Sequence, residues 1–318
     1  MTRCARITLL LVLLLGCSRA IAEGVTPFAD VLLWHASQQT SSVWASVIAT
    51  SEDYNSFSAE NIDFGWDPGF RIGFAHDPGQ PSWDTKVYWT QFRTSAEASC
   101  PAGSPTIVSE FFSGFVNVTA GKVNEAAVRW NLSFNTIDFE LGHTIAAGES
   151  VSLRPSMGLK AAFIRQKIHA NWNSTSSSLS ATERVDHDFR GFGPTFGIDA
   201  RWKPVPSGRL SVVGAFSGAL LWGVWNVEDA YARNDAEFPL LAYGALTTSM
   251  KDSSLGTVNL NYFLGLEWIR EGTVTVTGRV GYELQWWANQ QRLPTFQQLP
   301  MHGDLTLQGL TCGISVGF

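Results

Sequence analysis

The sequence has no long hydrophobic run and few charged residues, and these two shortages exclude several classes of protein. No uncharged apolar stretch reaches the ~20 residues that a membrane-spanning helix requires. Charged residues make up only 16% of the chain, whereas soluble domains average about 25%. Insertion into a membrane must therefore use strands, which cross it only as a closed barrel.

Cysteine and basic residues are also scarce. Of the four cysteines, Cys100 and Cys312 are the two outside the first 17 residues, and we expect no bridge between them because they belong to opposite ends of the predicted strands. The net charge is −6, which argues against a nucleic-acid partner because such proteins carry a basic stripe. The sequence contains no H-E-x-x-H motif, no C-x-x-C motif and no phosphate-binding loop, so we predict neither a metal nor a cofactor.

The N-terminus has the features of an export signal. Two arginines precede the apolar residues 7–15, and Ala20-Ile21-Ala22 forms an A-x-A cleavage site. These features predict a signal peptide over residues 1–22 and a single mature domain over residues 23–318. In a second interpretation Cys17 belongs to a lipobox and carries a lipid. Both interpretations export the protein, and the bacterial outer membrane is the expected location.

Beyond the signal, apolar residues recur with a period of two. In one segment Phe192, Phe196 and Trp202 share a face, while the alternate positions are small or charged. This pattern predicts strands. Ten segments show it, approximately 25–36, 61–76, 83–94, 125–142, 150–167, 189–202, 209–225, 258–269, 274–287 and 304–318.

The connections between these segments alternate between short turns and long polar loops. Outer-membrane barrels have this asymmetry, with short periplasmic turns and long outer loops. The sequence thus predicts an all-β fold, a transmembrane antiparallel up-and-down β-barrel of ten strands. Residues 43–48 and 106–118 would raise the number to twelve if they joined the wall. Between Phe134 and Ile137 the apolar phase slips by one residue, which indicates a bulge or an end of the membrane zone.

Aromatic residues gather at the ends of the predicted strands, as in the interface belts of membrane barrels. Amphipathic rings favour the headgroup level. The expected belts consist of Trp83, Trp202, Trp268 and Phe318 at the turn end, and of Trp34, Trp222, Trp225 and Trp286 at the loop end.

Charged residues of the strands fall on the face opposite the apolar one. A charge facing lipid costs about 2–4 kcal/mol at the midplane, so we expect these side chains to face the lumen. Their mixed signs leave two outcomes open: a wet constriction that selects ions, or pairing across the lumen that closes it. The candidate pore-lining residues are Arg154, Lys160, Asp199, Arg201, Glu267, Arg279 and Glu283.

The last strand, from Gly303 to Phe318, resembles the ending of the Legionella-type major outer membrane protein family. Similar stretches are Leu153-Arg154-Pro155, Gly191-Phe192-Gly193-Pro194 and Tyr282-Glu283 with Gln285-Trp286-Trp287. The resemblance implies a pore-forming, surface-exposed protein of a Gram-negative envelope. A terminal Phe is a signal that barrel-assembly machinery reads, so this machinery and outer-membrane lipid are the expected partners. The sequence leaves open whether the chain forms a homo-oligomer.

Three functions are compatible with these features. The sequence favours a porin-like protein for passive diffusion of small polar solutes or ions, and therefore no enzyme. The first alternative is a non-conducting structural or adhesive barrel with the polar loop 171–188 as its contact surface. The second alternative is an outer-membrane rim protease in which Asp186-His187-Asp188 supplies a general base.

Overall fold

The computed structural model describes residues 24–39, 43–50, 55–77, 83–111, 123–175, 178–205, 208–234, 245–293 and 301–317. The predicted signal peptide over residues 1–22, including Cys17, and the terminal Phe318 lie outside these ranges. Within them, no helix is long and apolar enough to span a membrane.

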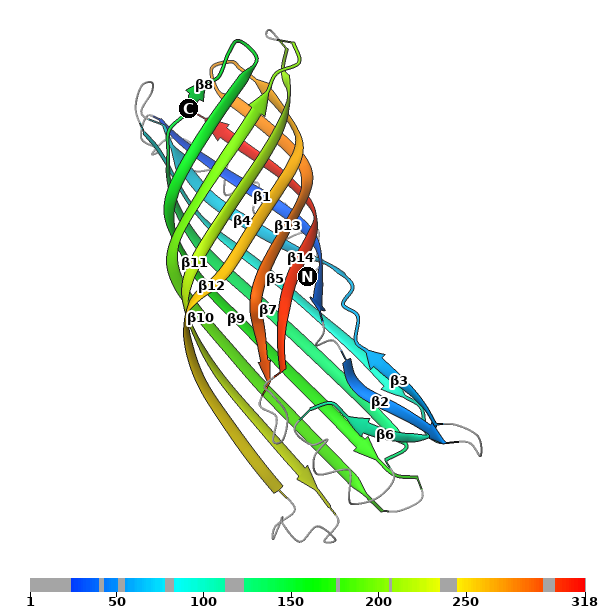
Figure 1. The fold of residues 1–318 in the computed structure, drawn as a ribbon. Coiled ribbons are helices and arrows are strands. Elements are labelled where there is room, and N and C mark those ends of the chain that lie inside the picture. The colour runs from blue at the N-terminus through cyan, green and yellow to red at the C-terminus, as the bar shows by residue number, and fades with distance from the viewer. Residues whose placement is uncertain are drawn as a thin grey trace.

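Ten long antiparallel strands form a closed, tilted barrel (Figure 1). Each strand pairs with its neighbour in the wall, and the last pairs with the first, so no edge is left open to lipid. The predicted ten-stranded barrel is therefore confirmed. The wall consists of β1 (Val25–Gln39), β4 (Trp66–His76), β5 (Asp84–Cys100), β7 (Glu125–Gly142), β9 (Val151–Asn173), β10 (Ser180–Trp202), β11 (Leu210–Arg233), β12 (Ala245–Arg270), β13 (Thr275–Leu293) and β14 (Met301–Gly317).

Three further strands form a separate small sheet at the loop end of the barrel. They are β2 (Val43–Thr50), β3 (Asn55–Asn61) and β6 (Thr106–Ser109), and a short β8 (Ile145–Ala146) pairs with β9 at the turn end. The twelve-strand alternative is wrong, because β2 and β6 pair with each other and not with the wall. The ring of Trp44 on β2 lies 5.6 Å from that of Trp172 and packs the small sheet onto β9.

Several strands continue much further toward the loop end than the sequence predicted. The expected loop 168–188 is mostly strand, since β9 runs to Asn173 and β10 begins at Ser180. The expected loop 226–257 is likewise shortened, because β11 extends to Arg233 and β12 begins at Ala245. These extensions were missed because their apolar residues have the opposite phase to those in the membrane zone.

This inversion of phase explains the slip noticed in the sequence. Phe134 is fully buried in the lumen, whereas Ile137 lies on the outer face with 48% of its surface exposed. The register of β7 with both of its neighbours is continuous at this point, so there is no bulge. The slip marks the end of the membrane zone. Toward the turns the wall is apolar outside, and toward the loops it is apolar inside.

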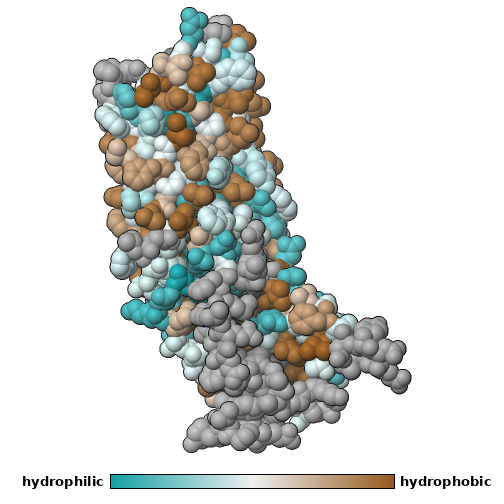
Figure 2. Space-filling view, viewed as in Figure 1, coloured by the Kyte–Doolittle hydropathy of each residue, from teal (hydrophilic) through white to brown (hydrophobic). Residues whose placement is uncertain are grey.

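The outer face of the turn-end half is a continuous apolar band. All ten wall strands contribute exposed large apolar side chains to it, and Figure 2 shows these brown residues above a more polar zone. Residues 192–202 span the band on β10. At ~3.3 Å per residue and a tilt of about 40°, this stretch projects to about 25 Å, the height of the apolar belt of outer-membrane barrels.

The aromatic belts agree only in part with those predicted from the sequence. Trp83, Trp202 and Trp268 are exposed at the turn end, and Trp222 is exposed at the opposite limit of the band. The placement of Trp34 and Trp225 in the outer belt is wrong. Both are fully buried inside the barrel, because they lie in or next to the region where the phase is inverted.

Candidate functional site

The turn-end half of the lumen holds a cavity of about 960 Å³. Residues beside the turns, such as Asp77, Lys203 and Glu271, line its mouth, so the cavity reaches the end of the barrel that carries the short turns. Outer-membrane barrels turn this end toward the periplasm. All seven candidate residues from the sequence line the cavity: Arg154, Lys160, Asp199, Arg201, Glu267, Arg279 and Glu283.

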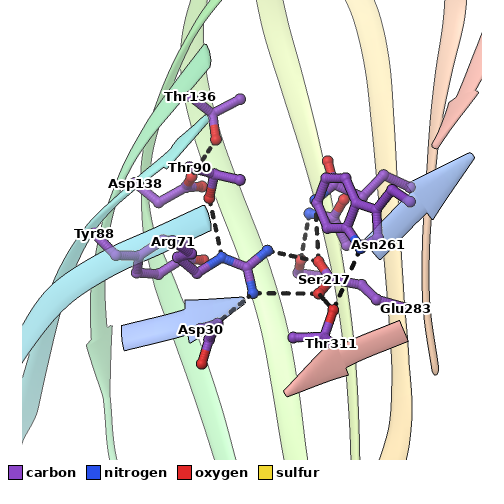
Figure 3. Close-up of polar contacts among 12 residues, drawn as sticks. Asp30, Arg71, Tyr88, Thr90, Thr136, Asp138, Ser217, Asn261, Glu283 and Thr311 are labelled. Atoms are coloured by element: carbon purple, nitrogen blue, oxygen red, sulfur yellow. Dashed lines mark hydrogen bonds and ion pairs between the residues drawn. The ribbon is translucent and has the colours of Figure 1, made fainter. Parts of the chain in front are cut away.

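Arg71 on β4 is the centre of the innermost ion-pair cluster (Figure 3). Its Nη2 atom lies 2.6 Å from Oε1 of Glu283, and its Nη1 atom lies 3.3 Å from Oδ2 of Asp30. Its Nε donates a hydrogen bond to Oγ1 of Thr90 at 3.0 Å. Asp30 also accepts a contact of 2.6 Å from Arg279. Both carboxylates are almost completely buried, and the two arginines compensate their charge.

A second cluster surrounds Arg154 on β9, nearer the turns. Its Nε donates to Oδ1 of Asp84 at 2.7 Å, and its Nη1 lies 3.2 Å from Oε2 of Glu140 and 3.1 Å from Oδ2 of Asp199. Lys86 reaches Asp199 from the opposite side at 3.1 Å. Three carboxylates thus share two cations, and the charge-assisted contacts hold each side chain in one position.

The remaining candidate residues form simpler pairs. Lys160 contacts Asp138 on the neighbouring strand at 2.5 Å, and both side chains are almost fully buried. Arg201 contacts Glu267 at 2.7 Å from β10 to β12. Every candidate residue therefore has an oppositely charged partner within the lumen.

Several of these pairs cross the lumen rather than follow the wall. Arg71 and Glu283 belong to β4 and β13, which β14 and β1 separate in the wall. Lys86 and Asp199 belong to β5 and β10, which β7 and β9 separate. The sequence left open whether the lumen charges line a wet constriction or pair across the lumen. The structure shows pairing across the lumen, next to a cavity that is large enough to hold water.

Two positions differ from the sequence interpretation. Asp30, which binds two arginines, was not among the predicted lumen charges. The inward orientation of Asp30 is hard to recognise in the sequence, because it is the only charged residue in β1 and forms no alternating pattern with other charges. The general expectation that charged side chains of the strands face inward is wrong for Arg129, which lies on the outer wall in a pair with Glu97, with both side chains more than 60% exposed. Arg129 lies beyond the phase inversion, where polar side chains face outward.

A layer of aromatic rings crosses the lumen above the charged cavity. The ring of Phe134 on β7 meets that of Trp287 on β13 edge to face at 5.4 Å between centroids. Trp34 and Phe92 pack at 5.7 Å beside them. The ammonium of Lys160 lies 5.9 Å from the ring of Trp287 and links this layer to the charged one. The layer therefore places apolar rings between the cavity and the loop end.

The end of β13 bends into the barrel just beyond this layer. Its register with β14 shifts between Trp287 and Gln291, and Asn289 has a φ of 50°. In the described residues, the ladder between β12 and β13 ends at the pair of Asn259 and Trp287. The bend therefore lies where β13 is no longer hydrogen-bonded to β12.

Arg292 anchors the bent end of β13 inside the lumen. Its guanidinium lies 3.6 Å from the ring centroid of Trp225 and forms an ion pair with Asp252 on β12. Its backbone N–H donates to Nε2 of His187 at 3.3 Å. Cation–π and ionic contacts thus add to the pairing of residues 291–293 with β14 and hold this segment in place.

The proposed catalytic triplet Asp186-His187-Asp188 does not assemble. Because strand residues alternate in direction, His187 faces the lumen while both aspartates face outward, where they pair with Lys167 and Arg165. Burial lowers the pKa of His187 to about 4, so its imidazole is neutral at pH 7 and accepts from Arg292. The hypothesis that these two carboxylates orient His187 as a general base is therefore wrong.

The buried His187 predicts a loss of stability in acid. Its pKa is about 4 in the folded barrel and 6.5 in an ordinary environment. The unfolded chain therefore binds a proton first, and the free energy of unfolding falls as the pH decreases from about 6.5 to 4, by about 3 kcal/mol in total. His187→Gln should remove most of this dependence in urea unfolding of micelle-embedded protein. The exposed His76→Gln is the control, and equal pH dependence of both variants would contradict the prediction.

The chain has a distant likeness to several solved bacterial structures. Among them are the outer membrane protease OmpT from Escherichia coli and the translocator domain of the autotransporter NalP from Neisseria meningitidis. The OmpT chain is 9% identical, with 92% of this chain and 96% of that chain covered and a TM-score of 0.47. The NalP domain is 12% identical, with coverages of 99% and 97% and a TM-score of 0.33. Neither likeness bears on activity.

The family comparison is more specific. No curated protein sequence matched the chain. One family model does, that described as the Legionella pneumophila major outer membrane protein precursor, and it covers residues 28–318. This match spans all ten wall strands except the first three residues of β1. With its apolar belt, closed wall and charged lumen, the chain belongs to the Legionella major outer membrane protein family of the outer membrane.

Proposed function

We propose that the protein is a gated pore that passes small cations and other small polar solutes across the outer membrane. The observation that carries the proposal is the cavity of about 960 Å³ in the membrane-embedded half, which is lined by paired charges and reaches the turn end. Nine acidic and seven Lys or Arg side chains line it. Because acidic linings favour cations, the excess of carboxylates supports a preference for cations.

The gate in this proposal is the aromatic layer together with the bent end of β13. An apolar constriction stops ions because water is unstable inside it. Trp287 belongs to this constriction and directly precedes the bend, so a movement of the strand end would move its ring. Beyond the pair of Asn259 and Trp287, the described residues form no ladder between β12 and β13, so the end of β13 can move away from β12 while it stays paired with β14.

Planar-bilayer recording of the purified, refolded protein tests the proposal. We expect discrete, small conductance steps with frequent closures. Under a KCl gradient, the sign of the reversal potential should indicate selectivity for cations. A reversal potential of the opposite sign would contradict the assignment of the carboxylates as the selective groups. The absence of current at all voltages, in preparations whose barrel is folded, would contradict the proposal of a pore.

A second candidate function, a non-conducting structural barrel, is favoured by one observation. The contact between Phe134 and Trp287 crosses the lumen, and cross-lumen ion pairs lie below it. In this case the extended wall beyond the membrane would serve as the contact surface, because the predicted loop 171–188 is largely strand. The absence of conductance combined with normal folding would favour this function.

Three expectations from the sequence remain part of the proposal. They are export with cleavage after Ala22, assembly through Phe318 by the barrel-assembly machinery, and contact with outer-membrane lipid over the apolar band. Mass spectrometry of the protein isolated from the envelope would test the cleavage, since the mature chain should begin at Glu23. An intact Cys17 carrying a lipid would instead support the lipobox.

A further inference from the structure

Three arginines stand on the outer wall just beyond the apolar band. Arg93 on β5, Arg165 on β9 and Arg190 on β10 all point outward, in a chain whose net charge is −6. We call this group the arginine rim. It lies on the loop-end side of the band, which outer-membrane barrels turn toward the cell surface. The rim is therefore at the level of the outer-leaflet headgroups.

The strand register brings the three side chains together. Arg93 and Arg165 are both paired with Ser133 on the intervening β7, so they belong to one row across the wall. At ~4.8 Å between strands, their Cα atoms are about 10 Å apart. Arg190 pairs with Phe163, one step nearer the membrane and diagonal to Arg165, at about 7–8 Å. Long, flexible arginine side chains can reach one shared ligand over such distances.

The charges of the rim are only partly compensated. Arg165 forms an ion pair with Asp188, and the other two arginines are exposed and have no ion-pair partner among the described residues. Unpaired guanidinium groups at the edge of a lipid phase favour an anion, and their planar donors match phosphate oxygens in a bidentate manner.

Next to the rim, on its membrane side, lies an apolar surface of β9, β10 and the neighbouring β11. Phe163, Phe192 and Trp222 expose 46%, 57% and 54% of their surfaces there. Phe163 and Arg190 are register partners on neighbouring strands, so the apolar and basic positions adjoin on the wall. A ligand for this combined surface needs phosphate groups and several acyl chains in one molecule.

We propose that the arginine rim binds a phosphorylated glycolipid of the outer leaflet. The guanidinium groups of Arg93, Arg165 and Arg190 contact its phosphates, and its acyl chains lie along Phe163, Phe192 and Trp222. This site is on the outside of the barrel and does not depend on conduction through the lumen.

Binding of purified lipid A to the refolded protein in mixed micelles tests the proposal. Three probes separate the possible sources of the phosphate: bis-phosphorylated lipid A, the same lipid without phosphates, and inorganic phosphate. The test variant is Arg93→Gln with Arg190→Gln, which keeps the pair of Arg165 and Asp188. The control is Arg209→Gln with Arg270→Gln, which removes the same charge from exposed positions at the turn end.

We expect the test variant to bind bis-phosphorylated lipid A at least tenfold more weakly, while the control variant changes less than twofold. Arg93→Lys with Arg190→Lys should fall between them, because the charge remains and the bidentate geometry is lost. This second variant also keeps the test decisive if the glutamine variant folds poorly.

Three results would overturn the proposal. The first is an equal loss of affinity in the test and control variants. The second is binding of phosphate-free lipid A as tight as that of the bis-phosphorylated form. The third is displacement of the lipid by inorganic phosphate at millimolar concentration, which would indicate a general anion site instead.

Discussion

Replacing Trp287 with alanine is expected to convert a mostly closed pore into one that is mostly open. The substitution removes the edge-to-face contact with Phe134 and the cation–π contact with Lys160. Each contact is worth about 1 kcal/mol, and their combined loss shifts the ratio of closed to open states by more than about tenfold. Single-channel recording should show a rise in open probability of that order, with a larger unitary conductance because the ring no longer fills the lumen.

Trp286→Ala is the matched control for this prediction. Trp286 is the same residue type in the next position, but it points out of the barrel, where its Nε1 donates to Asp304. Its removal should leave the open probability unchanged. Phe134→Ala should reproduce part of the effect of Trp287→Ala, since it removes the other ring of the pair. Equal conductance of the two tryptophan variants would rule out the aromatic layer as the gate.

Arg71→Met is expected to cause the largest loss of stability. Arg71 and Glu283 have side chains that are only 11% and 6% exposed. Removing one partner of such a pair leaves an uncompensated buried charge, which costs about 3–5 kcal/mol. Urea unfolding of the protein in micelles should show this loss. The double variant Arg71→Met with Glu283→Gln should regain much of it, because no unpaired carboxylate remains at position 283.

Arg129→Met provides the comparison for an exposed pair. Arg129 and Glu97 form an ion pair on the outer wall in which both side chains are mostly exposed to solvent. Such pairs contribute about 0–1 kcal/mol. If Arg71→Met were no more destabilising than Arg129→Met, or if the double variant were as unstable as the single one, the cross-lumen cluster would not be a stabilising element.

The strands of the membrane zone could be predicted from the sequence because lipid imposes a simple rule. Each outward side chain there must be apolar, so Phe192, Phe196 and Trp202 alternate visibly with small and charged residues. The same rule predicted that all seven candidate residues face inward, and they line one cavity. Only local alternation was needed for these inferences.

The parts beyond the membrane were harder to predict for the same physical reason. There water replaces lipid, so the apolar face turns inward, as Trp34 and Trp225 do, and the phase that marks a membrane strand is lost. The ends of β9, β10, β11 and β12 therefore looked like polar loops. The slip between Phe134 and Ile137 was the one local signal of the change.

Local alternation in the sequence was sufficient to predict a closed barrel with ten strands as the favoured number, the lipid-facing side of the strands in the membrane zone and the charged character of the lumen. Which charges neutralise one another, and that aromatic rings and the end of β13 lie across the lumen, became visible only in the folded barrel. Alternation is a property of neighbouring residues, whereas a contact such as that of Arg71 with Glu283 joins side chains 212 positions apart. Such residues come within hydrogen-bonding distance only when the barrel closes. Closure places strands that are not neighbours in the wall on facing sides of the lumen.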